Sequence, residues 1–375
     1  MATARVDDPV PVTFVISHAQ RGGAERYLEL LLDHLEPASV QSIVSLQDGP
    51  FVERLRGSGH RVEVVPTGPR LSMLRSAWRL RRLLRSGPPA AIHANGVKAA
   101  LVSVLATPRM GIPVIWVKHG FSWDGPLARA VASRCDQVVA VSEAVTATFR
   151  GRQRARVHVV HNGTPPLVRD RRAGRELVRA LVGGDGEVVA LIGRLHHDKG
   201  QIELVEAAPR VLERRPGTRF LLLGGEDPSV PEYARAVRAR VEELRLGESL
   251  ALRGHHPDAP GVMAGADLVV LPSVPDSRGT GREGFGLVAL EAMAVGTPVV
   301  GYAGGALPEV LGDCAELVPE GDRGALADAI VALLDDPARR EELARRGRER
   351  VATRFTIDAT VAGMRERYRA AARRG

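Results

Sequence analysis

Two glutamates eight residues apart flank a glycine-containing turn. The segment reads Glu283-Gly284-Phe285-Gly286-Leu287, and Glu291 follows within an apolar helical pattern. Glycines let a backbone approach a ligand closely, and the free amides of residues 285–287 at a helix start would attract a phosphate. Glu291 would then lie about 6 Å further along the helix, where its oxygens can accept both hydroxyls of a ribose. We expect a nucleoside diphosphate here, with Glu283 facing the group beyond the phosphates; the alternative is a surface loop with a solvated glutamate.

Two cations follow another strand-like stretch. Arg194 and Lys199 lie just after residues 188–193, with His196 and His197 between them. Fixed cations of this kind can neutralise the charge that grows on a departing diphosphate, the work that a magnesium ion does elsewhere. Adjacent histidines point apart and make a poor metal pair, and no Asp-x-Asp triplet occurs in the chain. We expect a metal-independent phosphate site; the alternative is an exposed basic loop.

The elements that must carry these residues alternate between short β-branched runs and longer amphipathic stretches, which is typical of βαβ units. The predicted strands are residues 12–17, 42–46, 62–65, 91–93, 114–117, 137–141, 157–160, 188–193, 220–223, 250–252, 267–271, 298–301 and 315–318. The alternation breaks between Gly163 and Gly186. We predict two doubly wound parallel-sheet domains, whose ligands bind at the carboxyl ends of the strands.

Composition narrows the class of protein. The 375 residues are 44% hydrophobic and 26% charged, which suits about two globular domains and excludes fibrous and disordered chains. The net charge is +8, but only 4% of residues are aromatic, too few for rows of base-stacking platforms. Cys135 and Cys314 form no CxxC pair, and no run approaches the roughly 18 apolar residues of a membrane span. We expect a cytoplasmic protein without a nucleic-acid partner.

With these motifs, the chain resembles the family 4 glycosyltransferases, which are retaining enzymes of the GT-B fold. The other similar segments are residues 22–26, 141–144, 161–163, 291–294, 296–300 and Phe355. The resemblance covers nearly the whole chain and implies an α/β protein with two Rossmann-like domains facing each other across a cleft. It implies an acceptor-binding domain over residues 1–165, a nucleotide-sugar-binding domain over 166–350, and a final helix over 351–375 that crosses back to the first domain.

The resemblance also implies roles for single residues. The residues that it assigns are Glu283, Arg194, Lys199 and His119 in catalysis, and Glu291, Gly284, Phe285, Gly286, Leu287, Gly22, Gly23 and His255 in donor binding. Glu283 would meet the donor sugar, Glu291 the ribose, and the two cations the diphosphate. His119 would face the donor sugar, although it could instead be an ordinary histidine at a strand end.

Two departures from the family pattern affect what can be transferred. Thr164 and Pro165 replace the usual apolar-Asp pair after residues 161–163, and residues 274–282 lengthen the loop before Glu283. The hinge and the donor-sugar pocket are therefore the parts to which the family pattern transfers least.

We expect transfer of a sugar from a nucleotide diphosphate to an acceptor hydroxyl with the anomeric configuration retained, in cell-surface polysaccharide or glycolipid biosynthesis. In front-face attack the leaving phosphate oxygen helps to deprotonate the hydroxyl, so the protein contributes positioning and electrostatics. No cofactor is implied besides the donor substrate, and the sequence does not distinguish UDP, GDP and ADP. A soluble natural product or oligosaccharide is the alternative acceptor.

Two other enzyme classes are rival hypotheses. An inverting transferase could use His18, which follows the first strand, as a general base on the acceptor. Residues 279–284 match GxGxxG, the pattern of dinucleotide-binding turns, but residues 273–278 separate them from the preceding strand. A dinucleotide turn needs a strand that runs straight into it, so we interpret this match as a decoy.

A non-enzymic alternative rests on residues 70–85. This stretch has six arginines and no acidic residue, with Leu71, Leu74, Trp78 and Leu83 as apolar partners. It resembles an interfacial helix, and predicts peripheral contact with an anionic membrane at the inner face and a lipid-linked acceptor. Without transferase activity, the chain would be a membrane-binding module. The alternative is an ordinary helix that packs Leu71, Leu74 and Trp78 on the sheet.

Overall fold

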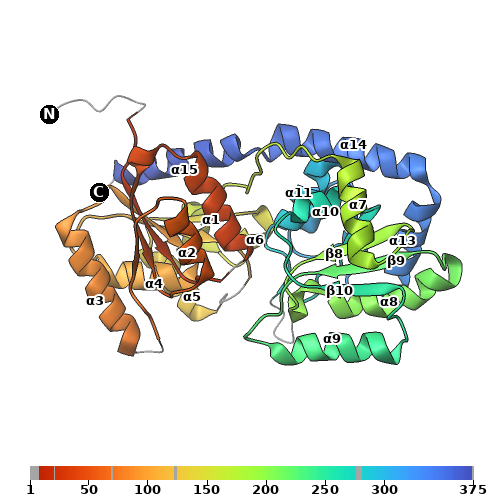
Figure 1. Ribbon diagram of the computed structural model, residues 1–375. Coiled ribbons are helices and arrows are strands. Elements are labelled where there is room, and N and C mark those ends of the chain that lie inside the picture. Colours follow the sequence, from red (N-terminus) through yellow and green to blue (C-terminus); the bar gives the residue numbers. More distant parts are fainter. Residues whose placement is uncertain (1–7, 21, 69–70, 122–124, 276–280, 374–375) are drawn as a thin grey trace. The chain divides into compact units, whose positions relative to one another are not determined.

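The chain folds into two compact units. The computed structural model describes residues 8–20, 22–68, 71–121, 125–275 and 281–373 (Figure 1). The first unit combines Met1–Gly163 with Ile357–Gly375, and the second unit is Thr164–Thr356. The sequence had suggested borders at residues 165 and 350. Each unit is a parallel sheet covered by helices, which is the GT-B arrangement of two Rossmann-like domains.

The first unit has a seven-stranded parallel sheet in the order β3-β2-β1-β4-β5-β6-β7. Its strands are β1 Val12–Ile16, β2 Val40–Ser45, β3 Val62–Val64, β4 Ala91–Asn95, β5 Val114–Lys118, β6 Gln137–Ala140 and β7 Val157–Val159. Its helices are α1 Gly23–His34, α2 Pro50–Gly57, α3 Leu71–Ser86, α4 Val97–Ala106, α5 Pro126–Arg134, α6 Glu143–Thr146 and α15 Ile357–Ala372, with short 3₁₀ turns at Pro37–Ser39 and Gly151–Arg156.

The second unit has a six-stranded parallel sheet in the order β10-β9-β8-β11-β12-β13. Its strands are β8 Val188–Ile192, β9 Arg219–Leu223, β10 Leu250–Arg253, β11 Leu268–Leu271, β12 Val299–Tyr302 and β13 Glu316–Val318. Its helices are α7 Arg171–Val182, α8 Gln201–Arg214, α9 Pro231–Glu243, α10 Ala259–Gly265, α11 Leu287–Val295, α12 Leu307–Leu311, α13 Arg323–Asp335 and α14 Pro337–Arg354, with a 3₁₀ turn at His197–Lys199.

The inner strands are buried along their whole length and are mostly apolar, because helices cover both faces of each sheet. Every residue of β1, β4, β5, β11 and β12 is buried. Each of the thirteen predicted strands overlaps a strand of the structure, so the predicted fold class is confirmed. Within the described residues, no helix is both long enough and apolar enough to cross a membrane.

Helix α3 packs on the first unit through a different side from the one that the ordinary-helix alternative predicted. Ala77, Leu80 and Leu84 are buried, whereas Leu74 is 58% exposed and Trp78 is 62% exposed. A spacing of three and four residues places the buried side chains on one stripe of the helix, and Leu74 and Trp78 lie off that stripe. The expectation that Leu74 and Trp78 pack on the sheet is therefore wrong. Arg70 lies outside the described residues.

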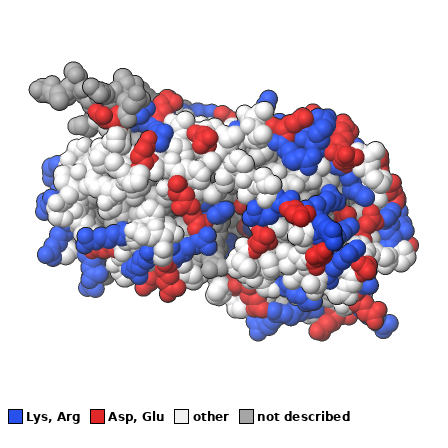
Figure 2. Space-filling model, turned by 45° about the horizontal axis from the view of Figure 1, so that its top comes forward, with Lys and Arg blue, Asp and Glu red and all other residues white. Residues whose placement is uncertain are grey.

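Charged side chains of the second unit are extensively paired. Figure 2 shows acidic and basic groups intermixed over this unit. Arg210 forms hydrogen bonds of 2.9 and 2.7 Å to Asp328, and Arg240 forms bonds of 2.6 and 3.0 Å to Glu206. Much of the arginine content is therefore neutralised within the fold.

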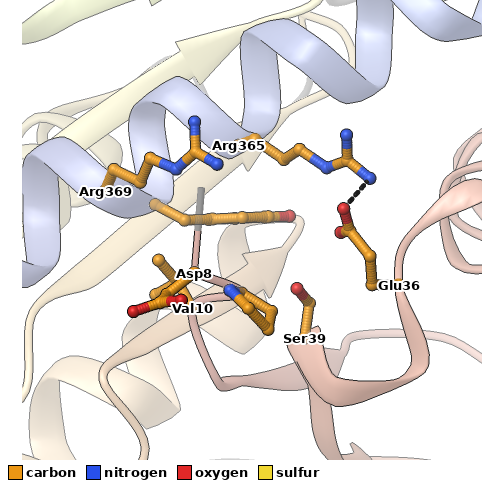
Figure 3. A pocket seen from close by; sticks show the side chains of 8 residues that line it. Asp8, Val10, Glu36, Ser39, Arg365 and Arg369 are labelled. Carbon is orange, nitrogen blue, oxygen red and sulfur yellow. Dashed lines mark ion pairs between the residues drawn. The ribbon is translucent and has the colours of Figure 1, made fainter. Parts of the chain in front are cut away.

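Helix α15 completes the first unit although it comes last in the chain. The hydroxyl of Tyr368 lies 2.7 Å from Nδ1 of His93 in β4, and the Phe14 ring of β1 meets the Tyr368 ring edge-on. Arg365 forms an ion pair of 2.5 Å with Glu36 beside a small cavity, as Figure 3 shows. The helix therefore covers β1 and β4 with a mixture of aromatic packing and polar bonds.

Candidate functional site

Each sheet reverses its strand order at one point, and ligands of such sheets bind there, outside the carboxyl ends of the strands. In the second unit the reversal lies between β8 and β11, and in the first unit between β1 and β4. Arg194 follows β8 and Ser273 follows β11. Candidate residues of the second unit therefore gather at the position that the topology favours.

Lys199 and Glu283 form the centre of the site in the second unit. The ammonium Nζ of Lys199 lies 2.6 Å from Oε1 of Glu283, and the hydroxyl of Ser273 donates to the same oxygen at 3.1 Å. The side chains of Lys199 and Glu283 are only 25% and 13% exposed. The structure thus brings together two residues that are 84 positions apart in the sequence.

The loop after β8 holds Lys199 in place. Gly200 adopts a left-handed backbone with φ of 67°, which ends the 3₁₀ turn and starts α8; a Cβ there would lie 1.8 Å from the carbonyl oxygen of Pro272. Only glycine fits such a position without strain. Burial opposes the charge on Lys199, but Glu283 and Asp198 outweigh it, so the pKa of Lys199 is raised above its ordinary value. Lys199 therefore stays a cation.

Arg194 pairs with an aspartate that follows the neighbouring strand. Its guanidinium donates to Asp227, which is 7% exposed and comes after β9. Burial tends to raise the pKa of Asp227, but hydrogen bonds from Ser229 and the charge of Arg194 lower it overall. This aspartate therefore stays ionised and orients the guanidinium.

The turn before α11 places a glycine with a left-handed backbone directly before the helix start. Gly286 is the residue before the helix, with φ of 90°, and α11 begins at Leu287. The amide of Ala306 donates to the carbonyl of Glu283 at 2.8 Å. Arg282 forms bonds of 2.9 and 3.0 Å to Glu320. Ala306 thus holds the carbonyl of Glu283, and the preceding Arg282 ties the loop to Glu320.

The aromatic residue of this turn is an anchor. Phe285 is buried, and its ring meets that of Phe355 edge-on at 5.7 Å. Gly284 precedes it within the same turn. Packing of Phe285 therefore holds the turn while the amides after it begin the helix.

The other predicted donor residues of the second unit lie at different depths. Glu291 is partly buried on α11, one turn after Leu287. His255 is exposed in the loop after β10, the outer strand, with β9 between it and β8. The structure brings Arg194 and Lys199 to one strand end with Glu283, and leaves His255 at the edge of the sheet.

The GxGxxG match does not have the structure of a dinucleotide turn. Strand β11 ends at Leu271 and α11 begins at Leu287, so the described part of the match, residues 281–284, follows no strand directly. Residues 276–280 lie outside the described part of the chain. The interpretation of this match as a decoy agrees with the observed elements.

The first unit has a pocket of about 150 Å³ at its own switch point. The residues that line it include Ser17, His18, Ala24, Glu25, Asn95, Gly96, Trp116, Lys118 and His119. Gly22 precedes α1 and Gly23 opens it, directly before two of the lining residues. His18 and His119, rival candidates from the sequence, therefore share one pocket.

Asn95 orients His119. Its side-chain nitrogen donates to the carbonyl of Ala24 at 3.2 Å, which turns its oxygen toward His119, and Nε2–H of His119 donates to that oxygen at 2.5 Å. The ring of Tyr27 meets His119 edge-on at 5.0 Å. Burial, helped by the charge of Lys118, lowers the pKa of His119 to about 3. His119 is therefore a neutral group in a fixed tautomer.

Comparison with known proteins identifies the family. The profile described as "Glycosyltransferase Family 4" matches residues 21–166, and that of "Glycosyl transferases group 1" matches residues 186–336. The D-inositol 3-phosphate glycosyltransferase of Rhodococcus erythropolis is 33% identical over 313 residues, which cover 75% of this chain and 68% of that protein. The chain belongs to the family 4 glycosyltransferases.

Two further proteins show how far this glycosyltransferase resembles known ones. A GDP-mannose-dependent monoacylated alpha-(1-6)-phosphatidylinositol monomannoside mannosyltransferase of Corynebacterium glutamicum is 33% identical over 165 residues, or 44% of this chain and 42% of that protein. The crystal structure of Anabaena Alr3699/HepE in complex with UDP and glucose has a TM-score of 0.85 at 23% identity and covers 96% of this chain and 100% of that one. The second likeness establishes the GT-B fold.

Sequence reasoning missed three polar residues of this glycosyltransferase. Asn95 ends β4, Asp227 follows β9 and Ser273 follows β11. In its sheet, β4 is a direct neighbour of β1, and β9 and β11 are direct neighbours of β8. The available signal was a polar residue at the end of an apolar run. For Asn95 the predicted strand stopped two residues early, at residue 93 rather than Asn95.

The adjacent histidines His196 and His197 stabilise the loop that follows β8. Nδ1 of His196 lies 2.7 Å from Asp198, while the His197 ring packs 4.4 Å from that of Tyr233. Across the residues that the structure describes, no three His, Cys, Asp or Glu side chains are grouped as metal ligands.

Proposed function

We propose that this glycosyltransferase moves a sugar from a nucleoside diphosphate to an acceptor hydroxyl with retention and without a metal ion. The observation that carries the proposal is the Lys199–Glu283 pair of 2.6 Å, which lies just before the start of α11. A cation supplies charge for a diphosphate, a carboxylate supplies acceptors for sugar hydroxyls, and the amides at a helix start supply donors for phosphate oxygens.

The proposed reaction needs no nucleophile from the protein. The bond from the anomeric carbon to the phosphate oxygen breaks, and a bond to the acceptor oxygen forms on the same face. The departing phosphate oxygen takes the acceptor proton. Arg194 and Lys199 neutralise the charge on that phosphate, and this charge is the largest one to develop.

Glu283 is suited to hold the sugar. Lys199 and Ser273 both contact its Oε1. Within the described chain its Oε2 accepts no hydrogen bond, which leaves an acceptor for a sugar hydroxyl. Glu291, further along α11, would accept the ribose hydroxyls.

We further propose a lipid-linked acceptor, and hence work at the cytoplasmic face of a membrane in glycolipid biosynthesis. The similarity to enzymes named for phosphatidylinositol monomannoside and for inositol 3-phosphate supports a polyol acceptor that carries phosphate. A soluble oligosaccharide or natural product is the alternative acceptor.

A thermal-shift screen tests the donor site. UDP, GDP, ADP and their sugars are added singly, and one nucleotide should raise the melting temperature because a ligand stabilises the state that binds it. Loss of this shift in Lys199→Ala would assign binding to the proposed site. Stabilisation by NAD with no response to any nucleoside diphosphate would instead refute the transferase mechanism.

Two measurements test the chemistry once the donor is known. The NMR coupling of the product's anomeric proton should match that of the donor. An inverted linkage would favour His18 as a general base in the pocket of the first unit. Added EDTA should leave most of the activity, and complete loss would overturn the metal-free mechanism.

A further inference from the structure

Helix α3 carries large apolar side chains on its solvent side. Leu74 and Trp78 are 58% and 62% exposed and lie four residues apart, so they are neighbours on the helix surface. The opposite side of the helix already packs through Ala77, Leu80 and Leu84, which are buried. Leu74 and Trp78 therefore contribute nothing to the hydrophobic core. Their contact with water is unfavourable, and a binding partner that covered them would remove this cost.

The same side of the helix is cationic. Arg75, Arg79, Arg82 and Arg85 are exposed, and the helix contains no acidic residue. In the described part of the chain these four arginines form no ion pair, in contrast to Arg210 and Arg240 of the second unit. Arg81 differs, since it donates to the carbonyls of Ala106 and Pro108 at 2.7 and 3.0 Å and so braces the end of α4.

The neighbouring helix α4 also carries an exposed apolar side chain. Helix α3 packs along α4, and Leu105, next to the carbonyl that Arg81 binds, is 41% exposed. Two exposed apolar side chains on one helix and one on its neighbour, together with four unpaired guanidinium groups, make an amphipathic cationic face. We call Leu74, Arg75, Trp78, Arg79, Arg82 and Arg85 the α3 face.

We propose that the α3 face docks the first unit onto an anionic phospholipid surface. Guanidinium groups pair with lipid phosphates, while Trp78 and Leu74 enter the boundary between headgroups and acyl chains, where an amphipathic aromatic ring is stable. The apolar pair favours a bilayer over a nucleic acid, which offers phosphates but no apolar phase. The link to a lipid-linked acceptor rests on the proposed function; the docking itself does not.

Flotation of the whole protein with vesicles tests the proposal. The protein should float with phosphatidylcholine vesicles that contain phosphatidylglycerol and should remain in solution with phosphatidylcholine alone. Added salt should release it, because exposed charges are screened within about 10 Å at 0.1 M. Equal binding to both kinds of vesicle would overturn the proposal.

Two variants separate charge from insertion. Changing Arg75, Arg79, Arg82 and Arg85 to Gln should weaken the partition coefficient by about 100-fold or more, as expected for four cations at a charged surface. Changing Trp78 and Leu74 to Ser should weaken it roughly tenfold. All six side chains lie at or near the surface, so circular dichroism should report a normal fold.

Matched controls come from elsewhere in the chain. Gln at Arg172, Arg235, Arg345 and Arg354 removes the same charge from exposed positions of the second unit. Ser at Leu127 and Val168, which are 46% and 86% exposed, removes comparable apolar surface. Both controls should bind vesicles as the parent does; losses equal to those of the α3 variants would show a general effect of charge or hydrophobicity and overturn the proposal.

Two outcomes identify rival explanations. If the Trp78 and Leu74 variant binds vesicles fully and single-stranded RNA displaces the parent, the face is a polyanion site and membrane docking is wrong. Nucleotide-induced thermal shifts should be unchanged in all α3 variants. A protein that floats but binds no nucleoside diphosphate would refute the proposed function and leave the docking surface standing.

Discussion

The carboxyl ends of the two sheets share a topology but differ in how their central polar side chains are paired. In the second unit, Lys199 pairs with Glu283 and Arg194 with Asp227. In the first unit, Glu25 and Lys118 also line the pocket, but the hydrogen bond that orients it joins two neutral groups: His119, whose pKa of about 3 leaves it uncharged, and the amide of Asn95. Both sets of residues follow strands that lie at, or next to, the point where the strand order reverses.

The difference shows that residues at or just past the strand ends, rather than the sheet, determine what each end can bind. A diphosphate needs cations that are already oriented, and internal ion pairs provide them without reorganisation during the reaction. Uncharged hydroxyls are better matched by neutral donors and acceptors of fixed tautomer, since a charge there would carry a desolvation penalty. The predictions below test whether this contrast holds.

Acid should destabilise the first unit well before the second. Burial lowers the pKa of both His93 and His119 from an ordinary 6.5 to about 3. The unfolded chain therefore takes up protons below pH 6.5 that the folded unit does not, so stability is full above pH 6.5 and falls as the pH drops toward 3. Between pH 7 and pH 5 we expect a loss of roughly 4 kcal/mol, or roughly 2 kcal/mol per histidine.

Tryptophan fluorescence during urea unfolding measures this loss selectively. All three tryptophans, Trp78, Trp116 and Trp123, belong to the first unit. In the second unit, burial raises the pKa of Asp198 and Asp227, but the hydrogen bonds they accept outweigh it and lower both below 3.8; their contribution is lost only in stronger acid. His119→Gln should remove about half of the pH dependence. An unchanged slope in that variant would contradict the neutral assignment of His119.

Removing a charge from the second unit should have the next largest effect. Lys199→Ala, Arg194→Ala and Glu283→Ala should each lower kcat by about 100-fold or more, which is at least about 2.7 kcal/mol of transition-state stabilisation. Arg210→Ala removes an exposed cation of α8 in the same unit and should keep near-parent kcat. Near-normal turnover in one of the first three variants would remove that residue from the mechanism.

Asn95 should matter through His119 rather than through the substrate. Asn95→Ala frees the imidazole and should lower kcat about tenfold, or about 1.4 kcal/mol. Asn95→Asp places a carboxylate where the amide oxygen lies 2.5 Å from Nε2, so it should raise the pKa of His119. Activity of this variant should therefore fall as the pH drops through the raised pKa. A pH profile identical to that of the parent would rule out the positioning role.

The smallest effect should come from the buried bond of α15. Tyr368→Phe removes the hydroxyl that lies 2.7 Å from Nδ1 of His93 and should cost about 1 kcal/mol of stability in the first unit. Tryptophan-detected unfolding measures the change. A loss of turnover larger than the loss of stability would mean that the bond also shapes the pocket.

Much of the fold was predictable because parallel strands covered on both faces must be apolar along their length. The runs at β1, β5 and β11 stand out from the amphipathic stretches around them for that reason. The end of β4 was not predictable, since Asn95 is a polar residue that remains in the strand. Its side chain is satisfied by His119 and Ala24, two contacts that depend on the fold.

The site was predictable in part. Local spacing placed Gly286 before a helix and put Lys199 close to Arg194. The partners Asp227 and Ser273 follow strands that become neighbours of β8 only in the folded sheet, and no local pattern gives strand order. For α3 the helix was predictable, but the choice between two apolar stripes depended on which one the rest of the unit could cover.

The position of α15 has a consequence for biosynthesis. The ribosome makes β1 and β4 early, but the helix that covers Phe14 and His93 emerges only after the entire second unit. The second unit is contiguous in the chain and can complete its sheet while α15 is still unmade. Until α15 has been made, the face of the first sheet that it covers stays exposed. The first unit is therefore the half that chaperones would need to protect during translation.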